Sequence, residues 1–142
     1  GYIDLTVLDI SKVAIERAKK RLGKNANKIN WIISDITNFY PERKYSVWHD
    51  RAVFHFLRNE QEINSYLKSL NDGTNDNGKL VIGTFAENGP LRCCALDVMR
   101  YSFNDLENTF SNYFQINKMI NSIHQTPFNT EQSFNFVQAI KK

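Results

Sequence analysis

Leu5-Thr6-Val7-Leu8-Asp9, Trp31-Ile32-Ile33-Ser34-Asp35 and Tyr45-Ser46-Val47-Trp48-His49-Asp50 are three short apolar runs, and each of them closes on an aspartate. Each run is rich in β-branched or aromatic residues and is bounded by polar ones, which is typical of a buried parallel strand. In an open α/β sheet, ligands bind beyond the carboxyl ends of the strands. Three acids at that edge would suit a ligand with hydroxyl groups and an amino group, such as a nucleoside.

The composition is that of an ordinary folded domain. The chain has 142 residues, of which 42% are apolar and 23% charged, and its net charge is +3. This length favours one domain over residues 1–142. The weak charge, with both signs interspersed, gives no argument for a nucleic-acid partner. No apolar stretch is long enough to cross a bilayer, so no membrane partner is expected.

The two cysteines, Cys93 and Cys94, are adjacent in the sequence. Adjacent cysteines do not bridge each other without strain, and the chain has no Cys-x-x-Cys or Cys/His spacing that would hold a metal ion. The N-terminus also lacks the charged and apolar regions of a signal peptide. We therefore expect reduced thiols, no metal site and a cytoplasmic protein.

The first predicted helix follows the first strand. Ser11 is placed to cap a helix that runs to about Leu22, where Gly23 ends it. Its apolar face is expected to consist of Ala14, Ala18 and Leu22. Four basic residues crowd its end: Lys19, Lys20, Arg21 and Lys24. They indicate either a basic patch or cations that complement the helix dipole on a solvated face, and the second interpretation is favoured.

The middle of the chain continues the alternation of helix and strand. A second helix is predicted from Asn59 to Leu70, followed by a polar turn region at residues 71–78 and a buried strand at Lys79–Phe85. The apolar positions of that helix fall at i, i+3, i+4 and i+7: Ile63, Tyr66, Leu67 and Leu70. A long loop from Ala86 to Tyr101 then leads to a third helix, which Ser102 caps. The inner face of the third helix carries Leu106 and Phe110.

The end of the chain has a looser apolar and polar alternation. Phe114–Ile123 and Ser133–Ile140 are predicted to be two antiparallel strands joined by a loop from His124 to Gln132. The whole pattern predicts an α/β fold with a doubly wound, mostly parallel, Rossmann-like sheet and a C-terminal antiparallel hairpin at one edge.

These ordered strand ends resemble those of the class I S-adenosylmethionine-dependent methyltransferases over nearly the whole chain. Leu8-Asp9-Ile10-Ser11 resembles the end of the family's second strand, whose acid binds both ribose hydroxyls, because a carboxylate can accept two O–H bonds. Ser34-Asp35-Ile36 resembles the end of the third strand, where the acid takes the adenine amino group and the next backbone N–H reaches a ring nitrogen. The resemblance implies S-adenosylmethionine as cofactor, with Asp9, Ile10, Asp35 and Ile36 among its binding residues.

The stretch from His49 to Leu57 resembles the family's fourth strand and its exit, which line the methionine part of the cofactor and face the acceptor. The resemblance places Asp50 at the cofactor edge, although pairing with Arg51 or another cation is the alternative. It also places His55 where it would face the transferred methyl group and accept a proton, since the ordinary pKa of histidine lies near neutrality. A hydrogen-bonded core histidine is the alternative, and the flanking phenylalanines favour it.

Further candidates concern the methyl acceptor. Arg51 and Arg92 could anchor an anionic acceptor, because a guanidinium group binds a carboxylate bidentately; ordinary surface salt bridges are the alternative. His124 could border the same pocket or belong to an ordinary loop. The loop from Ala86 to Tyr101 is longer than most connections, which predicts a lid over the acceptor.

One feature of the family is absent from the sequence. The family begins with a strand and a glycine-rich turn, whereas this chain begins at Gly1-Tyr2-Ile3, which resembles the end of the helix after that turn. Because the first strand is central in the family's sheet, its absence would leave two long strand edges unpaired. We therefore expect that residues 1–142 are a methyltransferase domain whose first strand and glycine-rich turn are missing from this sequence.

The sequence thus predicts methyl transfer from S-adenosylmethionine to a small-molecule acceptor by direct displacement. One alternative is a methyltransferase with a protein or nucleic-acid acceptor, which would show an open groove with a charged rim. The other is a nucleotide-binding domain without catalysis.

Overall fold

The computed structural model describes residues 2–142, and the chain divides into two compact units between Phe39 and Tyr40. Each unit is described by itself. Tyr2 and Ile3 form no helix, so the helix end expected there is not seen, and Gly1 lies outside the described residues. No helix within residues 2–142 is both long and apolar enough to span a membrane.

Unit 1 contains a pair of parallel strands and one helix. Its elements are β1 (Leu5–Asp9), α1 (Lys12–Leu22), the 3-10 helix η1 (Gly23–Lys28), β2 (Ile29–Ile33) and the 3-10 turn η2 (Ile36–Asn38). β1 and β2 run parallel with Asp9 opposite Ile33, which confirms the two predicted strands, although β2 ends two residues before Asp35.

The predicted cap of α1 is confirmed, but its predicted apolar face is right only at Ala18, which is half-buried. Ser11 Oγ accepts a hydrogen bond from the Ala14 N–H at 3.2 Å. The buried side chain is Ile15, whereas Ala14 and Leu22 are exposed. The face is rotated by one residue because burying a branched Ile removes more apolar area from water than burying an Ala.

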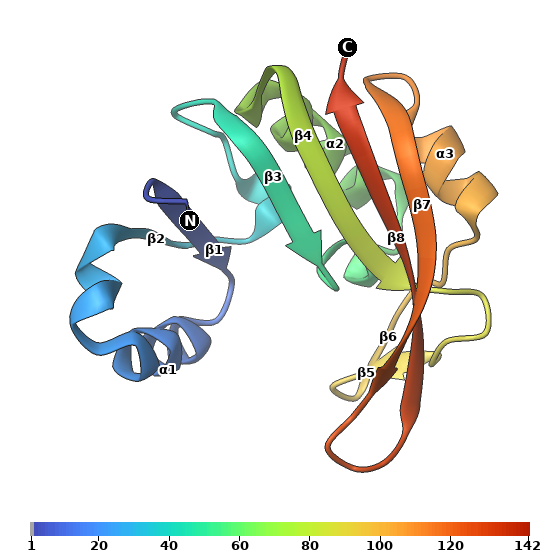
Figure 1. The fold of residues 1–142 in the computed structure, drawn as a ribbon, viewed down its shortest axis with the longest axis horizontal. Helices are drawn as coiled ribbons and strands as arrows, with labels where there is room; N and C mark the ends of the chain where they lie inside the picture. Colours follow the sequence, from blue (N-terminus) through green and yellow to red (C-terminus); the bar gives the residue numbers. More distant parts are fainter. Residues whose placement is uncertain (1) are drawn as a thin grey trace. The chain divides into compact units, whose positions relative to one another are not determined.

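Unit 2 is built on one four-stranded sheet (Figure 1). Its elements are β3 (Tyr45–Arg51), the 3-10 turn η3 (Phe54–Phe56), α2 (Glu60–Gly73), β4 (Thr74–Phe85), β5 (Arg92–Cys93), β6 (Leu96–Asp97), α3 (Phe103–Phe110), β7 (Phe114–Gln125) and β8 (Glu131–Lys141). The strand order is β3-β4-β8-β7; β3 and β4 are parallel, and β8 is antiparallel to both β4 and β7. The predicted α/β class and C-terminal hairpin are confirmed.

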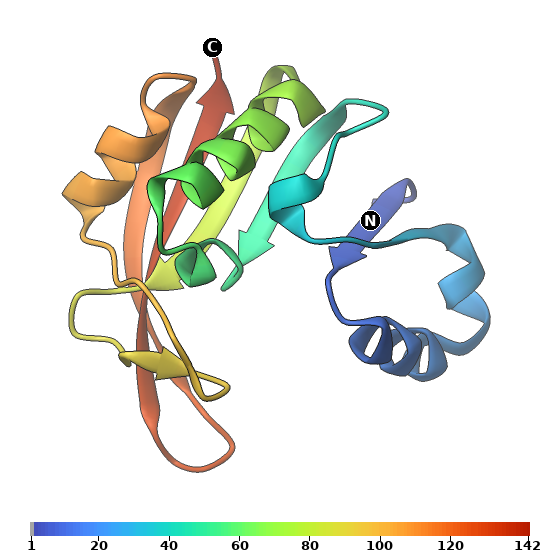
Figure 2. The same ribbon diagram turned by 180° about the vertical axis from the view of Figure 1, so that it is seen from behind.

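Helices α2 and α3 lie on the same face of the four-stranded sheet (Figure 2). Both begin with a reciprocal capping box, Asn59 with Glu62 and Ser102 with Asp105, which confirms the predicted cap at Ser102. The core beneath them is aromatic. The Phe54 ring centroid lies 4.9 Å from that of Tyr66 and 5.2 Å from that of Phe110. Other large side chains that are fully buried in unit 2 include Leu70, Leu80, Phe85 and Leu106.

The polar turn predicted at residues 71–78 is wrong. Helix α2 continues to Gly73 and β4 starts at Thr74. The Thr74 hydroxyl donates to the Leu70 carbonyl at 2.6 Å, and the Lys141 ammonium donates to the carbonyls of Asn71 and Thr74 at 2.6 and 2.9 Å. A distant lysine therefore satisfies the carbonyls at the end of the helix, which local sequence cannot reveal.

The long connection from Ala86 to Tyr101 contains a small hairpin, β5–β6, whose turn is Cys94–Ala95. Both turn residues have positive φ, 51° and 67°, which costs free energy for non-glycine residues. The N–H of Met99 donates to the His55 carbonyl at 2.8 Å, and the N–H of Tyr101 donates to the Phe85 carbonyl at 2.9 Å. The segment is thus fastened to the carboxyl end of β4.

The buried side chain of Leu106 tests the packing of α3 against the sheet. Leu106→Ala should lower the free energy of unfolding by about 2–5 kcal/mol, because it removes buried methyl groups and leaves a cavity. Leu96→Ala, at a 60% exposed position in β6, is the matched control and should change it by less than about 0.5 kcal/mol. Urea unfolding would measure both values, and equal effects would contradict the described core.

Candidate functional site

Asp9 and Asp35 leave the same edge of the unit 1 sheet. β1 and β2 are parallel, and the Ser34 N–H donates to the Asp9 carbonyl at 3.2 Å directly after β2. Asp9 is half-buried, and its Oδ1 accepts a hydrogen bond from the Ser11 N–H at 2.7 Å. Its second oxygen, Oδ2, accepts no hydrogen bond from residues 2–142. One oxygen therefore holds the turn into α1, and the other is left for a ligand or water.

Asp35 shows the same division between its two oxygens. Its Oδ1 accepts hydrogen bonds from the Thr37 N–H at 2.9 Å and the Thr37 hydroxyl at 2.8 Å, so Asp35 caps η2. Oδ2 has no such partner within the described chain. The Ile36 N–H opens this turn, where the first N–H groups of a helix have no intrahelical acceptor. Ile36 itself is buried, whereas Ile10 is 69% exposed.

Asp50 has a different environment, because it is buried and uses both oxygens inside unit 2. Oδ1 accepts from the Val53 N–H at 2.9 Å, and Oδ2 accepts from the Phe54 N–H at 3.1 Å and the Tyr66 hydroxyl at 2.8 Å. Burial raises the pKa of Asp50, and the hydrogen bonds from Tyr66 and the two backbone groups oppose that rise. No ion pair with Arg51 is seen among the described residues.

The Asp50 carboxylate closes a tight turn at the end of β3. Ala52, in the middle of this turn, has a φ of 72°. Its N–H still donates to the Gly83 carbonyl of β4 at 2.9 Å. A left-handed non-glycine residue stores strain and requires support from its surroundings. The hydrogen bonds from Val53 and Phe54 to Asp50 provide this support.

His55 is fully buried in this turn, which corrects the expectation that it titrates near neutrality. Its Nδ1 accepts the Phe85 N–H at 3.3 Å, and its ring lies against those of Phe56 and Phe85, with centroids 4.8 and 4.5 Å away. Burial lowers the pKa of His55 from 6.5 to about 4. The ring is therefore neutral at pH 7, and because Nδ1 is an acceptor, Nε2 carries the proton.

Three buried polar atoms around the end of β4 have no hydrogen-bond partner within the described residues: His55 Nε2, Thr84 Oγ1 and the Tyr101 hydroxyl. His55 and Tyr101 each form a hydrogen bond with the backbone of Phe85, and Thr84 is the residue that precedes it. Buried polar atoms are almost always paired, so each of these atoms is expected to meet its own water or ligand. Burial raises the pKa of Tyr101 to about 12, so its hydroxyl is a neutral donor.

The two arginines predicted to bind the methyl acceptor differ in how many contacts they already make within the protein. Arg51 is exposed at the end of β3, with its guanidinium carbon 5.5 Å from the centre of the Phe134 ring. Arg92 holds the β5–β6 hairpin together, since its Nη2 donates to the Ala95 carbonyl at 2.8 Å and its Nε lies 3.1 Å from Asp97 Oδ1. The surface salt bridge considered for Arg92 is therefore present.

His124 lies in a strand and not in the loop expected from sequence. It is exposed in β7 and faces Gln132 of β8, because both strands extend toward the turn beyond their predicted ends. Both cysteines are free, as expected, with Cys93 half-buried and Cys94 exposed. Burial and the neighbouring thiol raise the pKa of Cys93, so this thiol is not activated as a nucleophile.

Sequence reasoning missed the role of Tyr66. It was assigned only to the apolar face of α2, yet its hydroxyl bridges Asp50 and the Trp48 indole N–H, which lies 3.3 Å away. Burial and the nearby Asp50 raise the pKa of Tyr66 well above 10. A tyrosine on an otherwise apolar face, near a strand-end acid, is the signal that could have indicated this bond.

Comparison with known proteins gives the family. The family model described as Nodulation protein S (NodS) matches residues 2–93, more than half of the chain. "Malonyl-[acyl-carrier protein] O-methyltransferase 1" of Ilyobacter polytropus is 35% identical over 81 residues, which cover 57% of this chain and 29% of that protein. The chain spans about a third of the length of the first curated relatives it matches.

Solved structures share the fold. The N-methyltransferase NodS of Bradyrhizobium japonicum has a TM-score of 0.78 at 17% identity, covering 97% of this chain and 73% of that one. Its complex with S-adenosyl-L-homocysteine has a TM-score of 0.75 at 15% identity, with coverage of 97% and 66%. The resemblance inferred from the strand ends is confirmed: this chain belongs to the Nodulation protein S family and has the fold of the S-adenosylmethionine-dependent methyltransferases.

Proposed function

We propose that this chain forms part of an S-adenosylmethionine-dependent methyltransferase that acts on a small acceptor. The observation that carries the proposal is the pair of half-buried acids, Asp9 and Asp35, at one sheet edge, each with one carboxylate oxygen that accepts no hydrogen bond from residues 2–142. Membership of the NodS family supports it, as does the fold shared with a NodS structure that contains S-adenosyl-L-homocysteine.

The donor and acceptor groups of unit 1 fit the nucleoside part of this cofactor. Asp9 Oδ2 would accept hydrogen bonds from the ribose hydroxyls, and Asp35 Oδ2 would accept one from the adenine amino group. The Ile36 N–H would donate to a ring nitrogen, and the exposed side chain of Ile10 would contact the nucleoside. The bound cofactor would supply a methyl group on positively charged sulfur, which is already a good leaving group.

The proposed roles in unit 2 are mostly positional. We assign Asp50 to hold the strand-end turn, because all of its hydrogen bonds are made inside unit 2. His55 would hold the end of β4 in place and offer its Nε2–H as a donor. With a pKa of about 4 it is a weak base, so deprotonating the acceptor is not its proposed role.

Arg51 is the better of the two proposed anchors for an anionic acceptor. It is exposed, and stacking on Phe134 restricts its guanidinium before any ligand binds. Arg92 would first have to break its ion pair with Asp97, and His124 is placed on the exposed hairpin, so both are secondary candidates. The chain's residues would then contribute mainly by aligning the acceptor and excluding water.

We also propose a cytoplasmic location, which the two free cysteines support. The acceptor would be a small molecule, either free or attached to a carrier protein. The printed name of the Ilyobacter relative describes a substrate on an acyl carrier protein.

Asp9→Ala tests the cofactor assignment in the full-length protein that contains this chain. It should weaken S-adenosylmethionine binding about 10- to 1000-fold, because hydrogen bonds to a charged group contribute about 1.5–3 kcal/mol each. Isothermal titration calorimetry would measure the affinity. Glu16→Ala, an exposed acid paired with Lys19 on α1, is the control and should leave affinity unchanged. Unchanged affinity in a folded Asp9→Ala variant would contradict the assignment of Asp9 to the cofactor site.

The buried His55 should make stability fall in mild acid. Its folded-state pKa is lowered from 6.5 to about 4, so the stability it contributes is present above pH 6.5 and is lost as the pH falls toward 4. Between pH 7 and pH 5 the free energy of unfolding should drop by about 2 kcal/mol through this group. His55→Phe should remove that drop, whereas the exposed control His124→Asn should retain it. Urea unfolding at both pH values gives the comparison; an unaltered drop in His55→Phe would contradict the assignment.

A further inference from the structure

The positive charge of this protein is concentrated in one short segment. Residues 12–28, which form α1 and η1, carry seven lysines and arginines and one acid, Glu16. The other 125 residues carry 11 basic and 14 acidic side chains. The net charge of +3 is therefore the sum of a strongly basic segment, α1 with η1, and a slightly acidic rest of the chain.

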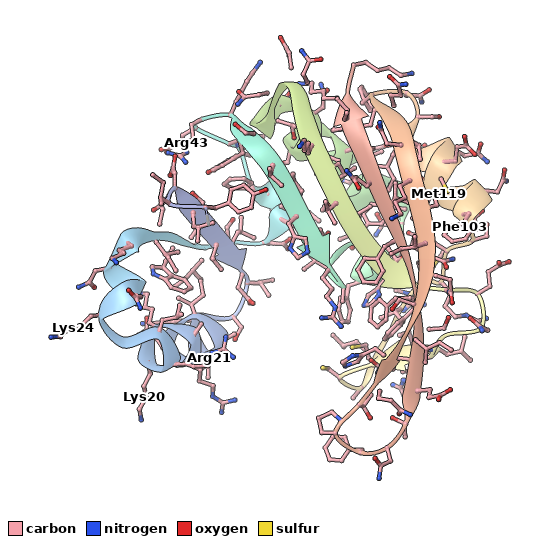
Figure 3. All side chains as sticks on the ribbon, viewed as in Figure 1. Lys20, Arg21, Lys24, Arg43, Phe103 and Met119 are labelled. Atoms are coloured by element: carbon pink, nitrogen blue, oxygen red, sulfur yellow. The ribbon has the colours of Figure 1, made fainter. Side chains whose placement is uncertain are left out.

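Three of these residues lie on the outside of α1, and a fourth follows just beyond its end. Arg17, Lys20, Arg21 and Lys24 are spaced at i, i+3, i+4 and i+7, and all four are exposed. Arg17, Lys20 and Arg21 share one face of α1, opposite the buried Ile15, whereas Lys24 lies in η1, just beyond Gly23, whose φ of 56° ends the helix. Figure 3 shows Lys20 and Lys24 extending outward from the end of α1 and from η1. We call these four residues the basic stripe.

Local electrostatics do not explain the basic stripe. Lys19 pairs with Glu16 at 3.1 Å, but no residue of the stripe has an ion pair within residues 2–142. The helix dipole favours cations in the last turn, which accounts for Lys20 and Arg21 only. Lys12 stands in the first turn, where no acid accompanies it and where a cation is unfavourable. Like charges three and four residues apart also repel each other.

Positive side chains without ion-pair partners suit a negatively charged partner. The length and composition of the segment indicate which class of partner it fits. Within α1, Arg17 to Arg21 spans about 6 Å at 1.5 Å per residue. Surfaces that bind single-stranded nucleic acid usually add aromatic side chains for base stacking, but residues 12–28 contain none, and the nearby Trp31 is half-buried with its indole N–H bonded to the Ala26 carbonyl. A helix that binds a membrane surface needs a wide exposed apolar face. The apolar side of α1 is instead turned inward, where it buries Ile15.

We propose that the basic stripe docks a small acidic carrier protein, which presents the acceptor to the enzyme. This inference rests on the proposed function and names how the acceptor is delivered. Complementary charge across such an interface speeds association and selects the partner, and it is weakened by salt.

The probe for the test is purified malonyl-acyl carrier protein, labelled for fluorescence anisotropy and titrated with the full-length enzyme. Lys20→Glu/Lys24→Glu should weaken binding at least 10-fold. Lys79→Glu/Lys118→Glu, two exposed lysines of β4 and β7, changes the net charge equally and should weaken it less than 2-fold. Raising the salt concentration from 50 to 300 mM should weaken wild-type binding several-fold and affect the stripe variant little. Circular dichroism melting confirms that both variants are folded.

Three outcomes would overturn the docking proposal: no binding of the carrier, equal loss in the two double variants, or tighter stripe-dependent binding of a DNA duplex or of phosphatidylglycerol vesicles. Calorimetry with S-adenosylmethionine separates this failure from failure of the proposed function. An enzyme that binds cofactor but not carrier refutes only the docking. An enzyme that binds carrier through the stripe but no cofactor refutes the proposed function and leaves the docking surface standing.

Discussion

The buried carboxylate of Asp50 is the constraint on which the centre of unit 2 depends. It accepts hydrogen bonds from the Val53 and Phe54 N–H groups and from the Tyr66 hydroxyl. These bonds join the end of β3, the turn η3 and helix α2. A buried carboxylate costs free energy unless such partners offset its lost hydration. Removing any one partner would therefore loosen the others, and with them the left-handed turn at Ala52.

The order imposed by Asp50 extends to the end of β4. The turn it closes carries His55, whose ring accepts the Phe85 N–H, while the Phe85 carbonyl accepts the Tyr101 N–H. The amide of Asn135 in β8 donates in turn to the Tyr101 carbonyl at 2.9 Å. Three chain segments distant in sequence are thus fixed around one strand end. This network of hydrogen bonds makes the end of β4 a rigid part of unit 2.

Sequence predicted the features that depend on local chemistry. The presence and order of the strands, the caps at Ser11 and Ser102, and the C-terminal hairpin all follow from patterns that span a few residues. The start of β4 was missed, because Lys141, far along the chain, satisfies the carbonyls of Asn71 and Thr74. The pKa of His55 was missed for the same reason: the residues that bury its ring include Phe85, 30 positions away. Tertiary contacts override local patterns at these positions.

The three strand-end aspartates looked equivalent in sequence. The structure distinguishes them by how many of their carboxylate oxygens accept hydrogen bonds from the protein. Asp50 uses both, so it is a structural group whose removal would act on folding first. Asp9 and Asp35 each use Oδ1 to fix the following turn, and among the described residues no donor reaches Oδ2 of either one. A turn-capping role and a ligand-binding role are therefore compatible in one carboxylate, since the bond at Oδ1 sets the orientation of Oδ2 and reduces the entropy lost when a ligand binds. The local-turn interpretation considered for Asp35 is thus part of the proposed binding geometry and does not compete with it.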